Sequence, residues 1–384
     1  MKILYIRTYV CYNRYMLKGM KFRVYPNKNQ LNIIENTFGC CRLVYNSGLA
    51  LRINTYKDGK SIGYKETSAM LTEMKRSSEY AFLKDVDSIA LQQSLKDLDK
   101  AYKNFFNNRA SFPKFKSKHN HHKSYRTQNV NGNISVVDKY IKLPKLGYVK
   151  AKINMPVIGK IKNATVECAP SGKYFCVLTV ECDTPVYTNK GNSIGIDVGI
   201  KSFYVDSNGY ECPNNKYLDK SKSKLLKEQR KLSRMVKGSS NYNKQRIKVA
   251  RVHERINDQR NDFLHKESTK LVRENQIICI EDLNVKGMVK NHRLAGAIND
   301  VSWSSFFSML EYKSYFYGTE IIKVPRFYAS SQTCNCCGNK NPKVKDLSIR
   351  VWTCSKCDTI NNRDLNAAKN ILAKGLELKL LPAA

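Results

Sequence analysis

The chain has 384 residues and a formal net charge of +35, from 67 Lys and Arg against 32 Asp and Glu. A small domain needs a net charge of only about 2–8 to stay soluble, so this excess indicates a polyanionic partner. Membrane lipid is disfavoured as that partner, because no stretch approaches the ~18 apolar residues of a spanning helix. Met1–Arg7 also lacks the long apolar core of a secretory signal. We therefore expect a cytoplasmic protein that binds nucleic acid.

The thirteen cysteines fit a reducing compartment. Their number is odd, the chain is long and no export signal precedes it, so free thiols are expected rather than disulfides. Five lie between residues 334 and 357, and the others, such as Cys40 and Cys279, stand in apolar stretches. We interpret the scattered cysteines as small buried hydrophobic residues.

Residues 1–15 look like an extension, and the first regular pattern follows Met16. Met20–Tyr25 alternates as a strand does, and Pro26 ends it. From Gln30 to about Tyr102, apolar residues recur at helical spacing, which predicts a helical region.

The segment 100–126 holds eight Lys or Arg and no acid, with aromatic residues between them. Basic side chains follow phosphates, and aromatic faces stack on unpaired bases. The alternative is a solvated loop whose Phe residues pack inward, and for any single residue the two are equally plausible. For the segment as a whole, we favour contact with nucleic acid.

Residues 127–187 contain short alternating stretches broken by Asn-Gly, Pro and Ser-Gly-Lys. This is typical of antiparallel β structure and predicts a small barrel. If Met20–Tyr25 is one of its strands, the helical region is an insertion within the barrel. Residues 188–192 have the composition of a linker.

A third unit begins at Ser193, where a strand and a hairpin are expected. Residues 218–262 predict a long basic helical region with a break at Gly238-Ser239-Ser240; it carries fourteen Lys or Arg against five acids. A buried strand from Ile277, a helix around Ser304–Phe316 and a strand at Ile321–Val324 follow.

Two C-x-x-C pairs, Cys334/Cys337 and Cys354/Cys357, come next, with sixteen residues between them. Four thiolates in two knuckles match the tetrahedral sulfur shell of structural zinc, and the gap is in the usual zinc-ribbon range. Cys336 is an additional thiol inside the first pair, and we interpret it as a spare residue because the 334/337 spacing is the standard one.

Three acids stand where apolar strands or helices would place them inside: Asp197, Glu281 and Asp364. Burying an unpaired carboxylate costs several kcal/mol, and hydrated divalent cations offset that cost. Two ions bridged by carboxylates activate a water and stabilise the leaving oxygen of a phosphodiester, and magnesium prefers such ligands. Each acid alone could instead pair with a basic neighbour, and Asp282 fits the pattern as well as Glu281. The order strand–Asp, strand–Glu, helix–Asp describes an RNase H-like nuclease core.

The chain resembles the TnpB family of RNA-guided nucleases from bacterial insertion sequences, historically described as transposases and related to type V CRISPR effectors. The resemblance runs from Met16 to about Leu372. It includes F-R-V-Y-P-N-K, C-C-R-L-V-Y-N, L-P-K-L-G-Y-V-K, G-I-D-V-G, R-I-N-D-Q-R-N-D-F-L-H-K, I-E-D-L-N-V-K-G-M, S-S-Q-T-C-x-x-C-G and N-R-D-L-N-A-A-K-N-I. Several of these stretches are specific, and their order makes chance agreement very improbable.

The resemblance implies an α/β multidomain fold, with an RNase H-like (RuvC) nuclease core that carries a zinc ribbon. It also implies an N-terminal β-barrel, the wedge, which carries a helical recognition insert. The implied ranges are an extension (1–15), the wedge barrel (16–26 and 127–187), the recognition lobe (27–126), the nuclease domain (193–372), the zinc-ribbon insert (330–360) and a tail (373–384).

By the same resemblance, Asp197, Glu281 and Asp364 take the catalytic positions and bind two Mg²⁺ ions, and Glu281 is preferred to Asp282. The cysteines would hold one Zn²⁺. The partners would be a guide RNA transcribed from the end of the element itself and a double-stranded DNA target, bound by one protein copy per RNA. Base pairing would supply selectivity, while the wedge and the lobe read a short motif beside the target. The ligand set for zinc is Cys334, Cys337, Cys354 and Cys357.

The sequence departs from the family pattern at several positions. Asn361-Asn362 stands where the family often has His-Asp, and Asp358 follows the second knuckle where Gly is common. Arg350 and Trp352 lie in the loop of the ribbon, where Arg contacts phosphate and Trp stacks on bases or packs over the metal site.

Two other functions compete with a guided endonuclease. A nuclease-inactive, RNA-guided repressor would typically have lost its catalytic acids, whereas all three are present. A DNA-strand transferase shares the RNase H-like chemistry, but the chain has no recognisable end-binding domain and no Tyr nucleophile in a His-hydrophobic-His setting.

Overall fold

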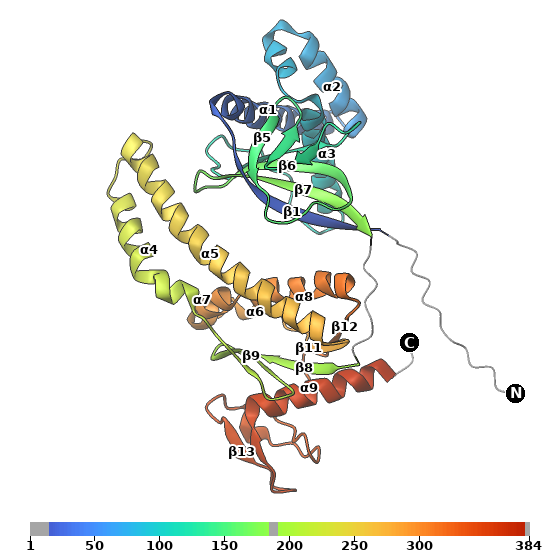
Figure 1. Ribbon diagram of the computed structural model, residues 1–384, viewed down its shortest axis with the longest axis vertical. Coiled ribbons are helices and arrows are strands. Elements are labelled where there is room, and N and C mark those ends of the chain that lie inside the picture. The colour runs from blue at the N-terminus through green and yellow to red at the C-terminus, as the bar shows by residue number, and fades with distance from the viewer. Residues whose placement is uncertain (1–14, 184–190, 381–384) are drawn as a thin grey trace, which may run out of the picture. The chain divides into compact units, whose positions relative to one another are not determined.

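The computed structural model describes residues 15–183 and 191–380 (Figure 1). The chain divides into two compact units, Met1–Thr184 and Pro185–Ala384, each of which is described by itself. The expected linker at 188–192 lies mostly outside the described residues, as does nearly all of the expected extension at 1–15. Within the described residues, every helix is too short or too polar to cross a membrane.

The first unit is built on a seven-stranded antiparallel sheet. Its strands are β1 (Tyr15–Tyr25), β2 (Lys123–Gln128), β3 (Ser135–Val137), β4 (Tyr140–Leu143), β5 (Gly147–Lys152), β6 (Lys160–Cys168) and β7 (Tyr174–Asp183). Their order is β2-β6-β7-β1-β5-β4-β3. Strand β1 lies between β7 and β5, so the strand expected at Met20–Tyr25 does belong to this sheet. No pairing among the described strands joins β2 to β3, so closure into a barrel stays a prediction.

The helical region confirms the periodicity of residues 30–102. It contains α1 (Lys28–Lys57), α2 (Tyr64–Arg76), the 3₁₀ helix η1 (Ser78–Lys84) and α3 (Ser88–Phe106). Asn27 begins α1 with a capping box, in which its side chain accepts from Gln30 N and Gln30 Oε1 accepts from Asn27 N. Helices α1 and α3 pack on each other and on β2, and their apolar residues share one core with the sheet.

The second unit contains a five-stranded mixed sheet. Its strands are β8 (Ser193–Val198), β9 (Ser202–Asp206), β10 (Glu211–Pro213), β11 (Ile277–Glu281) and β12 (Glu320–Val324). The order is β10-β9-β8-β11-β12, with β8, β11 and β12 parallel to one another. The hairpin of β9 and β10 continues the sheet in antiparallel fashion. The strands expected from Ser193, Ile277 and Ile321 are therefore confirmed.

Helices cover both faces of this sheet (Figure 1). Helices α5 and α8 pack on one face, and α9 lies along the other, against β8, β11 and β12. Helix α9 continues to Leu380, so much of the expected tail from residue 373 is helical. The helices of this unit are α4 (Tyr217–Ser233), α5 (Ser240–Glu274), α6 (Val285–Met288), α7 (His292–Val301), α8 (Trp303–Tyr317) and α9 (Arg363–Leu380).

The alternation of strand side chains decides which residues meet α9. Ile194 and Ile196 of β8, like Ile278 and Ile280 of β11, belong to the core beneath α5 and α8. Because successive side chains point to opposite faces, Asp197 and Glu281 lie on the α9 face, two residues after Gly195 and Cys279. Cys279 does pack with Ile371 of α9.

Glycines allow α9 to approach the sheet closely. A Cβ atom on Gly195 would lie 2.2 Å from the carbonyl oxygen of Ala368, and one on Gly375 would lie 2.3 Å from Cys279 Sγ. Both distances are too short for any real side chain, so the helix axis sits where only glycine fits.

The segment between β12 and α9 forms a small ribbon. It contains a 3₁₀ turn, η2 (Pro342–Lys345), and the antiparallel pair β13 (Val351–Thr353) and β14 (Ile360–Asn362). Its own small core joins Val344 and Trp352 to the cysteines. Trp352 is therefore packed over the cysteine cluster, which was one of the two roles considered for it.

Substituting Gly195 by Ala should destabilise the second unit by about 1–3 kcal/mol, because the new methyl group meets backbone atoms of α9. Chemical denaturation measures this difference. Gly296→Ala, in helix α7 with open space around its Cα, is the matched control and should be neutral or slightly stabilising. Equal destabilisation by the two substitutions would contradict the close contact.

Candidate active site

Two of the three candidate acids lie at the carboxyl ends of adjacent parallel strands. Asp197 is the fifth residue of β8 and Glu281 the last of β11, and the register pairs Ile196 with Ile280 immediately before them. Asp364 lies in the first turn of α9, the helix that covers this face. The predicted convergence of strand, strand and helix is therefore what the fold produces.

Burial dominates the electrostatics of Asp197 and Glu281, and repulsion by the neighbouring carboxylates adds to it at Asp197. Burial raises the pKa of Asp197 well above its usual range, and the nearby Glu281 and Asp364 carboxylates raise it further. The pKa of Glu281 is also raised by burial, and the hydrogen bond from Ser330 opposes that shift. The site therefore concentrates negative charge that the neighbouring Arg363 and Arg350 only partly compensate.

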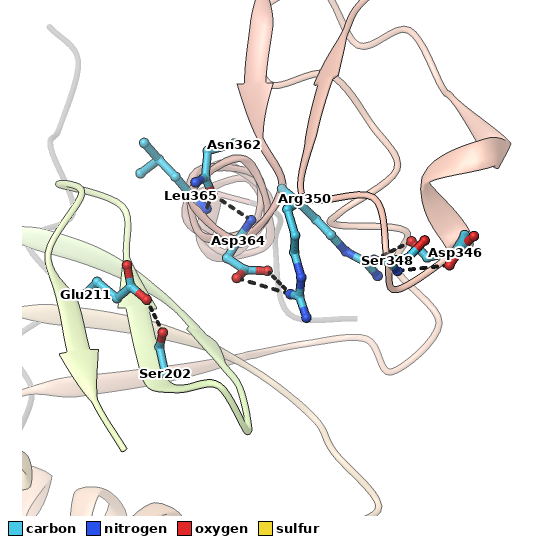
Figure 2. Close-up of polar contacts among 9 residues, drawn as sticks. Ser202, Glu211, Asp346, Ser348, Arg350, Asn362, Asp364 and Leu365 are labelled. Atoms are coloured by element: carbon cyan, nitrogen blue, oxygen red, sulfur yellow. Dashed lines mark hydrogen bonds and ion pairs between the residues drawn. The ribbon is translucent and has the colours of Figure 1, made fainter. Parts of the chain in front are cut away.

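Asp364 is positioned by the start of α9 (Figure 2). The Asn362 side chain accepts from the backbone N–H groups of Asp364 and Leu365, at 3.1 and 3.2 Å, and so caps the helix. Figure 2 also shows Arg350 beside Asp364, with a shortest N–O distance of 3.4 Å. Arg350 is half exposed, so this pair contributes at most about 1 kcal/mol and is easily exchanged.

The structure distinguishes Glu281 from Asp282. The Arg326 guanidinium donates to the Asp282 carboxylate at 2.9 Å and to its carbonyl oxygen at 3.1 Å. Asp282 is therefore an acid that pairs with a basic neighbour, which was the alternative considered for each candidate acid. Glu281 instead accepts from the Ser330 hydroxyl at 2.6 Å on the α9 side.

A buried asparagine clamp ties this serine to α9. Asn366 and Asn370, one helical turn apart, both donate to the carbonyl oxygens of Ser330 and Thr333, at 2.6–3.3 Å. Asn366 also accepts from the backbone and side chain of Asn335, at 2.9 and 2.8 Å. The clamp therefore links Glu281, the first cysteine knuckle and α9. The sequence contains these residues in S-S-Q-T-C and N-A-A-K-N, but only the fold reveals their contacts.

The four cysteines form a ready metal site. Their Sγ atoms all lie within 4.8 Å of one another, closer together than any other such group among the described residues. The three acids are spaced more widely than this. Backbone N–H groups of Lys356 and Cys357 lower the pKa of Cys354, which favours the thiolate that zinc binds, whereas burial and the neighbouring thiols raise the pKa of Cys337. Cys336 is exposed and does not belong to the cluster.

The departures from the family pattern have local structural roles. Asn361 is buried and donates to Thr359 O at 3.1 Å and toward Cys334 Sγ at 3.7 Å. It therefore supports the knuckles, while Asn362 caps α9. Asp358 has φ of 53°, and the corresponding Gly338 of the first knuckle has 72°. Both positions need the left-handed conformation, which explains why Gly is common at the second one.

The basic segment 100–126 divides into structural and exposed parts. Tyr125 is buried in the core, Lys123 pairs with Glu35 at 2.6 Å, and Arg126 pairs with Asp97. Phe106 and Phe115 are exposed. A groove of about 510 Å³ lies beside this segment and has Arg42, Phe115, Lys116, His122 and Lys123 in its lining. Contact with nucleic acid remains a prediction for the exposed part.

Comparison with known proteins identifies the class of the fold. A solved structure, the Cas12f1-sgRNA-target DNA complex, matches with a TM-score of 0.57 over 94% of this chain and 99% of that one, at 14% identity. The model of the Cas12f1-like TNB domain matches residues 303–371, which include all four cysteines. The fold is thus of the Cas12f type.

Family models and relatives define the chain further. The family described as "Probable transposase" matches residues 175–292, and a helix-turn-helix domain model matches 16–61. A "Putative RNA-guided DNA endonuclease" of Streptomyces pristinaespiralis is 40% identical over 94% of this chain and 89% of that protein. The "Putative RNA-guided DNA endonuclease InsQ" of Escherichia coli (strain K12) is 35% identical over 94% and 92%. The chain belongs to the TnpB family.

Replacing Asp197 by Asn should stabilise the metal-free protein at neutral pH. A raised pKa in the folded state means that the stability contributed by this group is complete below the unfolded pKa of about 3.9 and is lost as the pH rises. Asn carries no such charge, so its advantage should appear above about pH 4. The melting temperature should rise by about 2–4 °C for each kcal/mol of repulsion removed.

Calorimetry of the metal-free protein between pH 4 and pH 8 measures this gain. Asp262→Asn removes an exposed acid of the same unit that pairs with Lys266, and it should change stability little. A melting temperature of Asp197→Asn equal to or below that of the wild type at pH 8 would contradict the repulsion.

Comparing Cys337→Ser with Cys336→Ser should show which of the two thiols binds the metal. Loss of Cys337 removes one of four ligands, so zinc content should fall from one per chain toward zero and the ribbon should unfold. Cys336→Ser should retain zinc. Elemental analysis together with tryptophan fluorescence, to which Trp352 and Trp303 both contribute, measures both effects. Retention of zinc by Cys337→Ser would exclude the assigned ligand set.

Proposed function

We propose that this chain is an RNA-guided, magnesium-dependent DNA endonuclease encoded by an insertion sequence. The observation that carries the proposal is the meeting of Asp197, Glu281 and Asp364 on one face of the sheet, where burial and mutual repulsion raise the pKa of Asp197. Two relatives whose alignments cover 94% of this chain are named as putative RNA-guided DNA endonucleases, and these names support the same activity.

The acids fit a divalent cation by their chemistry. They supply hard oxygen ligands, and their charge is poorly compensated by the protein itself. Magnesium bound by Asp197, Glu281 and Asp364 would activate a water and stabilise the leaving oxygen of a phosphodiester. Ser330 fixes one oxygen of Glu281, and Asn362 fixes the start of α9 that carries Asp364.

Arg350 is suited to contact the substrate. Its guanidinium lies beside Asp364 in a weak, half-exposed pair, and guanidinium groups bind phosphate oxygens in the same planar manner as carboxylates. We infer that Arg350 leaves Asp364 when substrate binds and contacts the phosphate of the phosphodiester bond that is cut. The protein would thus hold a positive charge next to the reacting group.

The remaining charge suits a guide RNA and a DNA duplex. Helix α4 presents Lys227, Arg230 and Lys231 along one surface groove, which Arg234 lines just past the end of the helix. The first unit would be the wedge, with α1–α3 as the recognition lobe, and the second unit the RuvC-like nuclease with its zinc ribbon. Cas12f1 was solved with guide RNA and target DNA, and its fold likeness supports this division.

Cleavage of a plasmid tests the proposal. The protein is co-expressed with the RNA from its own locus and given magnesium and a matching target beside randomised flanks. The wild type should cut targets with one enriched flank motif, and Asp197→Ala should cut at least about 10³-fold more slowly, because it loses several kcal/mol of metal-assisted stabilisation. Asp282→Asn, which keeps an acceptor for Arg326, should cut at a rate within about tenfold of the wild type.

The alternatives give different results in the same experiment. Retained RNA and target binding without any cutting by the wild type would indicate a guided repressor. Excision or joining of element ends without guide RNA would indicate a strand transferase. Cutting that survives Asp197→Ala would refute the assignment of the acids.

A further inference from the structure

Phe327 is displayed on a turn, Pro325–Ser330, that follows β12. Its side chain is 94% exposed, more than any other large apolar side chain of the described residues. Single exposed apolar residues are common and need no explanation by themselves. What sets Phe327 apart is how firmly the residues around it are held.

Both neighbours of Phe327 are anchored. On one side, Arg326 donates two hydrogen bonds to Asp282, at 2.9 and 3.1 Å, in a half-exposed pair. On the other, Tyr328 packs against the core formed by Cys279, Val324 and Ile371, and its N–H donates to Pro325 O at 3.0 Å. The turn therefore projects one aromatic ring into solvent while its backbone is held in place.

Both ends of the turn lie next to Glu281 of the candidate active site. Ser330 donates to Glu281 at 2.6 Å and is held by Asn366 and Asn370. Val324 is the register partner of Glu281, and Phe327 follows it by three residues, a span of at most about 11 Å. Phe327 therefore lies at the edge of the site that carries the acids.

We propose that Phe327 is a stacking site for an unpaired base of the DNA strand that is cut; this inference rests on the proposed function. An unpaired base offers a free face to an exposed ring, and stacking of this kind tolerates any sequence. Arg350, beside Asp364, supplies charge for an adjoining phosphate. A net charge of +35 disfavours a second copy of the chain as the occupant.

The role of Phe327 in the reaction follows from the rigidity of the turn that carries it. A single strand is flexible, so a phosphodiester that enters the site must be oriented before it reacts. A ring whose backbone is already ordered does this at little entropic cost. Phe327 is thus a substrate-positioning residue, and an aliphatic side chain of similar size should not replace it.

Photocrosslinking tests the contact without any cutting. Asp197→Asn protein, with its guide RNA, is given targets that carry a single 5-iododeoxyuridine at successive positions, and also the corresponding single strand alone. Irradiation should join the base to the tryptic peptide that begins at Phe327, at one or two neighbouring positions. The crosslink should be lost in Phe327→Leu and kept in Phe327→Tyr.

Cleavage kinetics supply the second readout. Phe327→Leu should lower the cutting rate roughly 5- to 150-fold, as expected for loss of one stacked base, and Phe327→Trp should restore it. Tyr315→Leu is the control, because this aromatic residue of α8 is also exposed, at 79%, but lies outside the turn. It should cut as the wild type does.

The two readouts separate this inference from the proposed function. A crosslink at Phe327 in a protein that never cuts would preserve the stacking site and refute the nuclease. Equal crosslinking and cutting by the wild type and Phe327→Leu would overturn the stacking site alone. A self-association of the wild type that Phe327→Leu abolishes, without a crosslink at this peptide, would also overturn it.

Discussion

The close packing of α9 on the mixed sheet is the contact on which the rest of the second unit depends. Gly195 and Gly375 remove the side chains that would hold the helix away, and the resulting approach brings Asp364 to the ends of β8 and β11. The same approach lowers the stability of the metal-free fold, because Asp197 then shares a partly buried space with two other carboxylates. Under the proposed function, cations bound by the three acids would offset this burial and repulsion, which is the usual compromise between stability and activity at a functional site.

The ribbon also helps to position Glu281 of the candidate active site. Its first knuckle contacts Asn366 through Asn335, and Asn366 holds Ser330, which in turn holds Glu281. Formation of the cysteine cluster and orientation of a candidate catalytic acid are therefore linked through one buried hydrogen-bond network. Such networks are valuable when every member is satisfied and costly when one is lost. Under the proposed function, the network would make the geometry of the active site depend on the cysteine cluster beside it.

The sequence predicted the parts of this arrangement that depend on local pattern. The apolar stretches around Asp197 and Glu281, the spacing of the four cysteines and the helical period after Asp364 are visible in the residues alone. The pairing of Arg326 with Asp282 and the asparagine clamp were not predicted, because they join segments that only tertiary packing brings together. The exposure of Phe327 was hidden for the same reason, since a Phe beside a strand is more often buried.

The most direct test of the central claim, that the three acids form one cation site, is anomalous diffraction from crystals soaked in Mn²⁺. The account predicts manganese between Asp197, Glu281 and Asp364, with Arg350 moved away from Asp364. Zinc at the cysteine cluster, identified at its own absorption edge, serves as the internal control. Zinc in its cluster with no manganese at the acids, and with Arg350 still paired to Asp364, would contradict it.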